Sequence, residues 1–128
     1  MLIFGNPYIE ATRFIEINSI SQIDATTPKD ILLVEFKEPF TLAKYCLKNA
    51  LPYAIEASSI KDALIATNLG VGYLITNLEL AKTLQKIANE YLWDSKILVK
   101  IKDDSTLEKV ALNYIDGVIY QNHIERIN

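Results

Sequence analysis

The segment YAIEASSIKDALIATNLGVGYLIT, residues 53–76, decides the fold class, because it places an amphipathic stretch between two short apolar runs. The runs, 53–57 and 73–75, carry one charged residue, Glu56, and have the length of β-strands. Between them, apolar and small residues recur at the spacing of one helix face, at Ile60, Ala63, Leu64 and Thr67. Apolar strands joined by a helix are typical of parallel sheets, so the segment predicts one β-α-β unit.

Both ends of the predicted helix carry boundary signals. The Ser59 hydroxyl can accept a hydrogen bond from a backbone N–H of the first turn, and Asp62 occupies the capping-box position. Gly70 follows the last helical residue, where many helices end in a left-handed conformation that costs glycine little. The signals predict a helix that begins after Ser59 and ends before Gly70.

The same pattern recurs along the chain, with strand starts predicted near residues 31, 53, 72, 96 and 117. Their separation, roughly 19 to 24 residues, fits one strand and one helix in each repeat. Further helices are predicted to begin at Glu38-Pro39 and at two capping boxes, 76–79 and 105–108.

The 128 residues are predicted to form one domain, whose repeated β-α units span residues 29–121. Residues 1–28 form an irregular N-terminal segment, in which 13–17 is a strand candidate, either in a hairpin or in a first β-α unit. Residues 122–128 are read as a polar tail.

The units IKDALIATNLGVGYLI (60–75) and TLEKVALNYIDGVIY (106–120) resemble those of phosphate-binding βα barrels and of flavodoxin-like domains. We expect a single three-layer α-β-α domain with a mainly parallel, five- or six-stranded, doubly wound sheet of the flavodoxin-like kind. The alternative is a half βα barrel, because a full eight-stranded barrel needs about 250 residues. A half barrel would leave open strand edges and would therefore have to dimerise.

Composition and charge restrict the class of protein. The net charge is −3 with acids and bases interspersed, which argues against nucleic-acid and anionic membrane surfaces. No apolar run approaches the roughly 20 residues that span a bilayer, and the first residues do not resemble a signal peptide. A single cysteine, Cys46, excludes an internal disulfide, so we expect a cytoplasmic protein.

Ligands of parallel α/β sheets bind beyond the carboxyl ends of the strands, which gives a set of candidate residues. Those at the predicted edge are Glu35, Lys37, Glu56, Ser58, Thr76, Asn77, Lys102, Asp103, Asp104 and Gln121. Glu35 and Glu56 end consecutive strands, where two carboxylates can perform acid–base chemistry or hold Mg²⁺. They can equally be solvated, or pair with Lys37 or Lys100.

Known motifs for cofactors, metals and nucleophiles do not occur. Gly70-Val71-Gly72 ends a helix and enters a strand, whereas a dinucleotide fingerprint follows a strand and opens a helix. One histidine and one cysteine do not make a zinc site, and Cys46 lies on the apolar face of its helix. We therefore expect no cofactor and no metal. Trp93 either covers the core or anchors a partner protein.

The sequence does not establish an activity. We expect a non-catalytic binding or regulatory module that acts through a protein partner or through a homodimer. The alternative is a small enzyme or ligand sensor that binds a small metabolite, with or without a phosphate group, through Glu35, Glu56 and Lys102.

Overall fold

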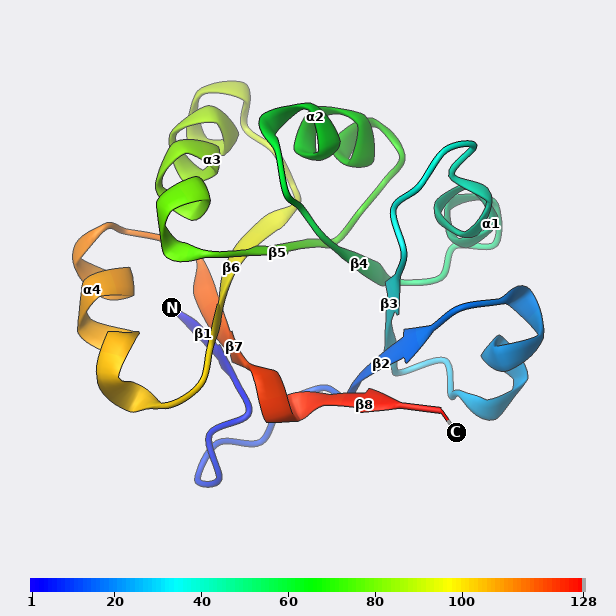
Figure 1. The fold of residues 1–128 in the computed structure, drawn as a ribbon, viewed down its shortest axis with the longest axis horizontal. Coiled ribbons are helices and arrows are strands. Elements are labelled where there is room, and N and C mark those ends of the chain that lie inside the picture. Colours follow the sequence, from blue (N-terminus) through cyan, green and yellow to red (C-terminus); the bar gives the residue numbers. More distant parts are fainter. Residues whose placement is uncertain (128) are drawn as a thin grey trace.

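The computed structural model describes residues 1–127, which fold into one curled sheet of eight strands with helices outside it (Figure 1). All neighbouring strands are parallel, in the order β1-β7-β6-β5-β4-β3-β2-β8. The strands are β1 Leu2–Phe4, β2 Phe14–Ile17, β3 Ile31–Val34, β4 Tyr53–Glu56, β5 Tyr73–Thr76, β6 Lys96–Ile101, β7 Gly117–Tyr120 and β8 Ile124–Arg126.

The helices lie around the outside of the curled sheet (Figure 1). The α-helices are α1 Thr41–Lys48, α2 Ile60–Asn68, α3 Leu78–Tyr91 and α4 Leu107–Leu112. The 3-10 helices are η1 Ile20–Ala25, η2 Asp104–Thr106 and η3 Gln121–His123. Within the described residues, no helix is both long and apolar enough to cross a membrane.

The short connection between β7 and β8 explains why the sheet curls. Only η3 separates the two strands, and four Cα–Cα steps from Tyr120 to Ile124 reach at most about 14 Å. β7 is nevertheless the second strand of the sheet order and β8 the eighth. In a flat sheet, strands six places apart would be separated by about 29 Å. The sheet must therefore bend round, into a half-barrel form.

The curled sheet corrects the expected architecture. The prediction of an α/β fold with a parallel sheet is confirmed, but the open flavodoxin-like sheet of five or six strands is wrong. Helices do not cover both faces, because the concave face is filled by the sheet's own apolar side chains. Those side chains are Phe4, Phe14, Ile31, Leu33, Ala54, Ile75, Leu98 and Ile119, with Tyr73 and Ile124 packed against them.

Aromatic rings bring the two ends of the sheet together inside the curl. The ring of Phe14 in β2 lies 5.0 Å from that of Phe4 in β1 and 5.4 Å from that of Tyr73 in β5, in edge-to-face geometry. On the convex face, alternate strand residues such as Ile97 and Val99 pack with helix residues such as Leu84 in a second, larger core.

The structure confirms the predicted strand starts to within one residue, at 31, 53, 73, 96 and 117. The Ser59 hydroxyl accepts a hydrogen bond from the Asp62 backbone N–H at 3.1 Å, as predicted for a helix cap. Gly70 has a φ of +76°, in the left-handed region, and directly follows the last residues of α2. The central unit therefore has the boundaries that its sequence predicts.

Three other helices begin one or two residues after their predicted starts, and the residues predicted to begin or cap them do not do so. Asn77, rather than Thr76, caps α3 by accepting a hydrogen bond from the Leu80 N–H at 2.9 Å. Asp103 accepts a hydrogen bond from the Ser105 N–H at the start of η2, so Ser105 is not a cap. Helix α1 begins at Thr41, after a turn that contains Pro39. Local capping patterns gave the region of each helix but missed its first residue, because several polar side chains compete for the cap.

Both ends of the chain contribute strands to the sheet, whereas the sequence predicted the strand candidate 13–17 in the N-terminal segment and a polar tail at residues 122–128. The N-terminal segment does not form a hairpin. β2 is followed by the 3-10 helix η1 and pairs in parallel with β3, as the alternative of a first unit of the main sheet predicts, whereas β1 pairs with β7. Most of the predicted tail is η3 and β8. Strands of three residues, such as β1 and β8, are too short to produce a recognisable alternation of apolar and polar residues.

A buried carboxylate ties β2 to the segment before β3. Asp30, whose side chain is 6% exposed, accepts hydrogen bonds from Arg13 Nε at 3.1 Å and Nη2 at 2.7 Å. It also accepts one from the Thr27 N–H at 2.8 Å. The hydrogen bonds from Arg13, which outweigh the effect of burial, lower the pKa of Asp30 below its ordinary value of 3.8.

This pairing makes the stability depend on acid pH. Because the folded protein has the lower pKa, the stabilisation is complete above the ordinary pKa and is lost as the pH falls through the lowered one. We expect Asp30→Asn to reduce stability at neutral pH and the difference from the wild type to shrink below about pH 4. Urea unfolding at a series of pH values measures the difference in unfolding free energy between Asp30→Asn and the wild type. The exposed Asp24→Asn is the control. A difference that stays constant down to the lowest pH would contradict this role of Asp30.

Candidate functional site

The carboxyl ends of strands β2 to β8 form a polar ring above the apolar interior of the curled sheet. Side chains two residues apart in a strand point to the same face of the sheet. In each of these seven strands, the residue two positions after the last apolar interior residue therefore faces the mouth, and in all seven it is polar. We call these residues the polar ring: Glu16, Glu35, Glu56, Asn77, Lys100, Gln121 and Arg126.

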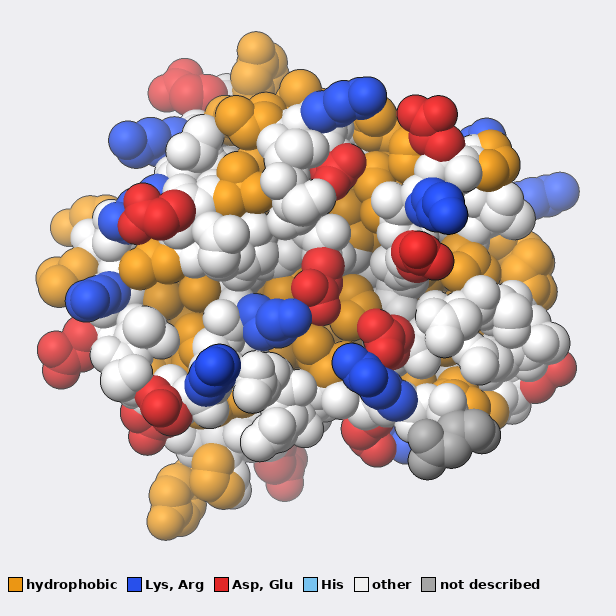
Figure 2. All heavy atoms as spheres, in the orientation of Figure 1, with side chains coloured by type: hydrophobic (Ala, Val, Ile, Leu, Met, Phe, Trp, Pro, Cys, Tyr) orange, Lys and Arg blue, Asp and Glu red, His pale blue; other side chains and the backbone are white. Residues whose placement is uncertain are grey.

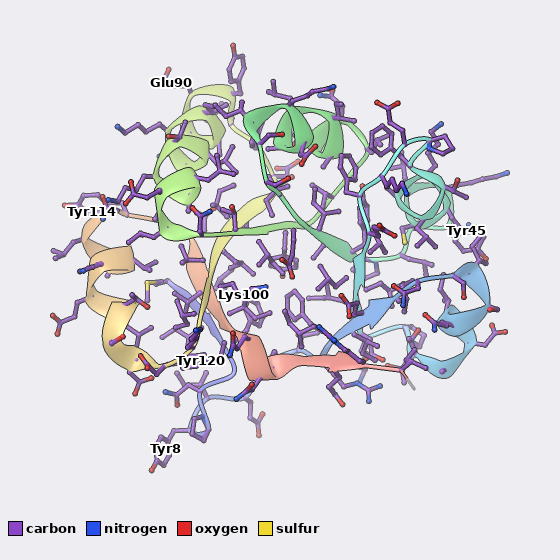
Figure 3. The ribbon with its side chains drawn as sticks, in the orientation of Figure 1. Tyr8, Tyr45, Glu90, Lys100, Tyr114 and Tyr120 are labelled. Carbon is purple, nitrogen blue, oxygen red and sulfur yellow. The ribbon has the colours of Figure 1, made fainter. Side chains whose placement is uncertain are left out.

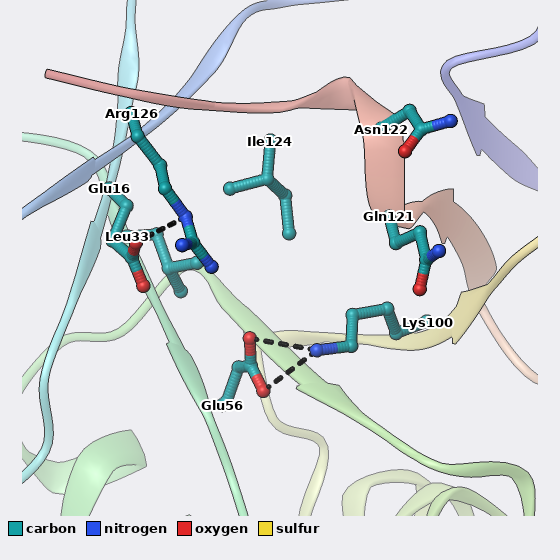
Figure 4. Close-up of a pocket in the computed structure, with 8 residues that line it drawn as sticks. All are labelled: Glu16, Leu33, Glu56, Lys100, Gln121, Asn122, Ile124 and Arg126. Carbon is teal, nitrogen blue, oxygen red and sulfur yellow. Dashed lines mark hydrogen bonds and ion pairs between the residues drawn. The ribbon is translucent and has the colours of Figure 1, made fainter. Parts of the chain in front are cut away.

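A cavity of about 580 Å³ opens inside this ring (Figure 4). Its floor is apolar, formed by Leu33 and Ile124, and its walls are polar. The full lining is Glu16, Leu33, Glu56, Lys100, Gln121, Asn122, Ile124 and Arg126. Figure 3 shows Lys100 near the middle of the mouth, whereas Tyr8, Tyr45, Glu90 and Tyr114 project from the outside of the molecule. The cavity has the size of a small-molecule site.

Two ion pairs cross the mouth of the cavity. Lys100 Nζ in β6 lies 3.1 Å from both carboxylate oxygens of Glu56 in β4, and the pair therefore bridges the intervening strand β5. Arg126 Nε lies 3.0 Å from Glu16 Oε2, and these two residues are register partners in β8 and β2. Figure 2 shows basic and acidic side chains next to one another over apolar atoms at the centre of this face.

The ion pairs are open to solvent. The side chains of Lys100 and Glu56 are 38% and 50% exposed, and that of Arg126 is 78% exposed. Exposed ion pairs of this kind contribute at most about 1 kcal/mol, because water screens the charges. A ligand with suitable charges can therefore replace either partner at little cost to the fold.

A second cavity, of about 490 Å³, adjoins the first and shares Glu16, Leu33 and Glu56 with it. Its lining adds Asn18, Val34, Glu35, Phe36, Ser58 and Asp62. Four of its side chains are carboxylates, and none is a lysine or arginine. Asp62 Oδ2 accepts a hydrogen bond from the Ser58 hydroxyl at 3.0 Å, and Phe36 stacks on Phe40 with the ring centroids 4.4 Å apart.

A third hollow, of about 230 Å³, lies on the other side of the Glu56–Lys100 pair. Thr76 and Asn77 line it, together with Ile75 and Ala57. Thr76 is buried and donates a hydrogen bond from its hydroxyl to the Ala57 carbonyl at 2.9 Å, while the Asn77 side chain caps α3. Both side chains therefore have structural roles.

The candidate residues from the sequence fall into two groups. The main cavity contains Glu56 and Gln121, the second contains Glu35 and Ser58, and the third contains Thr76 and Asn77. The other four, Lys37, Lys102, Asp103 and Asp104, are exposed and line none of these cavities. Of the alternatives left open for Glu56, the structure shows the pairing with Lys100.

Asp103 and Asp104 instead fix the loop after β6. Hydrogen bonds from Ser105, through its side chain and its backbone, lower the pKa of Asp103. Asp104 accepts a hydrogen bond from the Tyr120 hydroxyl, and this contact raises the pKa of Tyr120. These carboxylates are therefore structural groups at the rim of the mouth.

Glu16, Ile124 and Arg126 line the main cavity but are absent from the candidates expected from the sequence. They lie in β2 and β8, which fall within the strand candidate 13–17 and within the segment predicted to be a tail. The signal that could have found Glu16 is its spacing of two from Phe14, which matches the spacing of Glu56 from Ala54 and of Lys100 from Leu98.

Within residues 1–127, neither a cluster of metal-ligating side chains nor the thiol of Cys46 lies at the mouth. No group of three or more His, Cys, Asp or Glu side chains within residues 1–127 has a geometry that could hold a metal ion. Cys46 is fully buried in the outer core, and burial raises the pKa of its thiol to about 11. Trp93 is half-buried and packs against the same core.

Comparison with known proteins adds no family to this description. No protein-family model matches the chain, and no curated protein sequence matches it significantly. The candidate site is therefore defined by the geometry of its own side chains.

Proposed function

We propose that the protein is a binding module that takes up a small polar molecule in the cavity at the carboxyl mouth of the sheet. The convergence of two solvent-open ion pairs on one cavity with an apolar floor carries the proposal. Lys100 and Arg126 provide donors for an anionic or carbonyl group, and Glu16 and Glu56 provide acceptors. Gln121 and Asn122 can serve either role.

A binding role is favoured over a catalytic one by the chemistry of the lining. Among the described residues around the main cavity, no side chain carries a hydroxyl, a thiol or an imidazole. Such a lining lacks the nucleophiles that acyl or phosphoryl transfer most often uses, and it is suited to recognition through charge and hydrogen bonding.

Replacing Lys100 tests this proposal directly. A thermal-shift screen with amino acids, sugar phosphates, nucleotides and divalent ions should first identify a ligand that raises the melting temperature. We expect Lys100→Gln to weaken binding of that ligand by about tenfold or more, because it removes a charge-assisted hydrogen bond. The unfolding free energy should change by less than about 1 kcal/mol, since the ion pair is exposed.

Lys102→Gln is the matched control, because Lys102 is an exposed lysine close in sequence that lies outside the cavities. It should bind the ligand as the wild type does. Equal loss in both variants, or no loss in either, would reject the site. Isothermal titration calorimetry measures all three affinities.

Self-association is a second candidate function, favoured by apolar side chains at the ends of two helices. Tyr91 is the last residue of α3 and Leu92 its C-cap, and their side chains are 73% and 85% exposed. Leu112 and Tyr114 at the end of α4 are 76% and 85% exposed. Exposed apolar clusters often mark contacts between proteins. Sedimentation velocity tests this candidate, and a monomer at all concentrations would reject it.

A further inference from the structure

We infer that the ligand of the mouth is dipolar, with a cationic group such as an ammonium at one end and a carboxylate or phosphate at the other. This inference rests on the proposed binding function and specifies the chemical class of its ligand. It follows from the unequal distribution of charge between the two adjoining cavities, which share Glu16, Leu33 and Glu56.

Acidic and basic residues occupy opposite arcs of the polar ring. Three consecutive strands, β2, β3 and β4, contribute the carboxylates of Glu16, Glu35 and Glu56. The cations come from β6 and β8, as Lys100 and Arg126. The mouth therefore has a negative side and a positive side, although the two ion pairs bring the charges together at the centre (Figure 4).

The second cavity is suited to a cationic group. Glu16, Glu35, Glu56 and Asp62 line it, without any lysine or arginine in its wall. No ion pair within residues 1–127 involves Glu35, so this carboxylate lacks a basic partner there. Phe36 adds an aromatic ring, whose face attracts cations. An ammonium group here would gain both ionic hydrogen bonds and a favourable aromatic contact.

The first cavity is suited to an anionic group. Both cations of the mouth line it, and Figure 4 shows the Arg126 and Lys100 side chains extending toward its interior from two sides. Gln121 and Asn122 contribute amide N–H donors on a third side. Guanidinium and ammonium groups supplemented by amides are the usual partners of carboxylates and phosphates.

The ion pairs explain why both charges are needed in one molecule. An anion that draws Lys100 away leaves Glu56 without its counterion, and a cation that occupies Glu56 leaves Lys100 without its own. In either exchange, the ion pair that breaks within the protein is worth about as much as the ion pair that forms with the ligand. A dipolar ligand replaces both partners at once, so every charge remains paired after binding.

Matched probes of equal length test the charge pattern. For a four-carbon chain they are aminobutyrate, succinate, butanediamine and butanediol, and for a six-carbon chain aminohexanoate, adipate, hexanediamine and hexanediol. Amide NMR titration of the isotope-labelled protein gives each affinity and reports contact through the side-chain signals of Gln121 and Asn122. We expect an amino acid to bind about tenfold or more tightly than the diacid, diamine and diol of its length.

Glu35→Gln provides the second measurement, because it removes a carboxylate of the cationic cavity that forms no ion pair among the described residues. It should weaken amino acid binding about fivefold. Glu90→Gln removes the same charge on the outside of α3 and should leave the affinity unchanged (Figure 3). A diacid or diamine that binds as tightly as the amino acid would overturn the dipolar ligand while leaving the binding site intact. If neither these probes nor any compound of the thermal-shift screen perturbs Gln121 or Asn122, the binding function itself fails.

Discussion

Phe14→Ala is expected to lower the free energy of unfolding by about 4 kcal/mol, which is a large part of the stability of a domain of this size. Phe14 is fully buried inside the curled sheet, where its ring contacts those of Phe4 and Tyr73. Truncation would remove these contacts and leave a cavity where β1, β2 and β5 meet. Chemical denaturation followed by circular dichroism measures the loss.

Tyr8→Ala is the matched control for this aromatic truncation. Tyr8 is 95% exposed, so its removal should change stability by less than about 0.5 kcal/mol. If Phe14→Ala were also nearly neutral, the concave face would not be a packed interior. The rings of Phe4, Phe14 and Tyr73 would then not pack together, and the sheet would be less tightly curled than these contacts indicate.

Gly117→Ala is expected to destabilise the fold by about 3 kcal/mol and to release β1 from the sheet. A Cβ at this position would lie 2.5 Å from the backbone carbonyl oxygen of Leu2 and 2.7 Å from Leu2 Cβ. Leu2 is the register partner of Gly117, so the two strands cannot keep their pairing without moving apart. Hydrogen exchange of the β1 and β7 amides should report the loss of pairing, and urea unfolding the loss of stability.

Gly72→Ala separates this steric effect from the general cost of replacing a glycine. A Cβ at Gly72 would lie 3.4 Å from its nearest neighbour, the Tyr53 carbonyl oxygen, at an ordinary contact distance. We therefore expect Gly72→Ala to be near neutral, within about 0.5 kcal/mol. Two variants of equal stability would show that β1 does not pack against Gly117 as tightly as the contact distances indicate.

The repeated β-α units were predictable because their signals are local. Apolar runs such as 31–34 and 96–101 alternate with helical spacing at a regular interval, and their starts agree with the observed strands. The sequence also placed Glu35, Glu56 and Gln121 correctly at the carboxyl ends of strands. It missed Arg126, because the three-residue strand β8 is recognisable only from its pairing with β2. It missed Glu16 although 13–17 was a strand candidate, because no local pattern shows that this strand ends at the same edge of the sheet as β3 and β4.

The choice between a flat and a curled sheet could not be read from those signals. In a doubly wound sheet, residues such as Leu98 and Val99 would both be buried under helices. In the curled sheet Leu98 packs inside against other strands, and Val99 packs outside against the helices. The two arrangements require the same apolar run, so the run cannot distinguish them.

By itself, the sequence determined that this protein is an α/β chain of repeated units with parallel strands, since strand and helix periodicities arise within about 20 residues. Only the tertiary structure decided that the sheet curls, that β1 and β8 complete it, and that Glu16 and Arg126 meet Glu56 and Lys100 around one cavity. These features depend on pairing between the two ends of the chain, such as β1 with β7 and β2 with β8. Contacts over such a sequence separation leave no periodic trace in either segment.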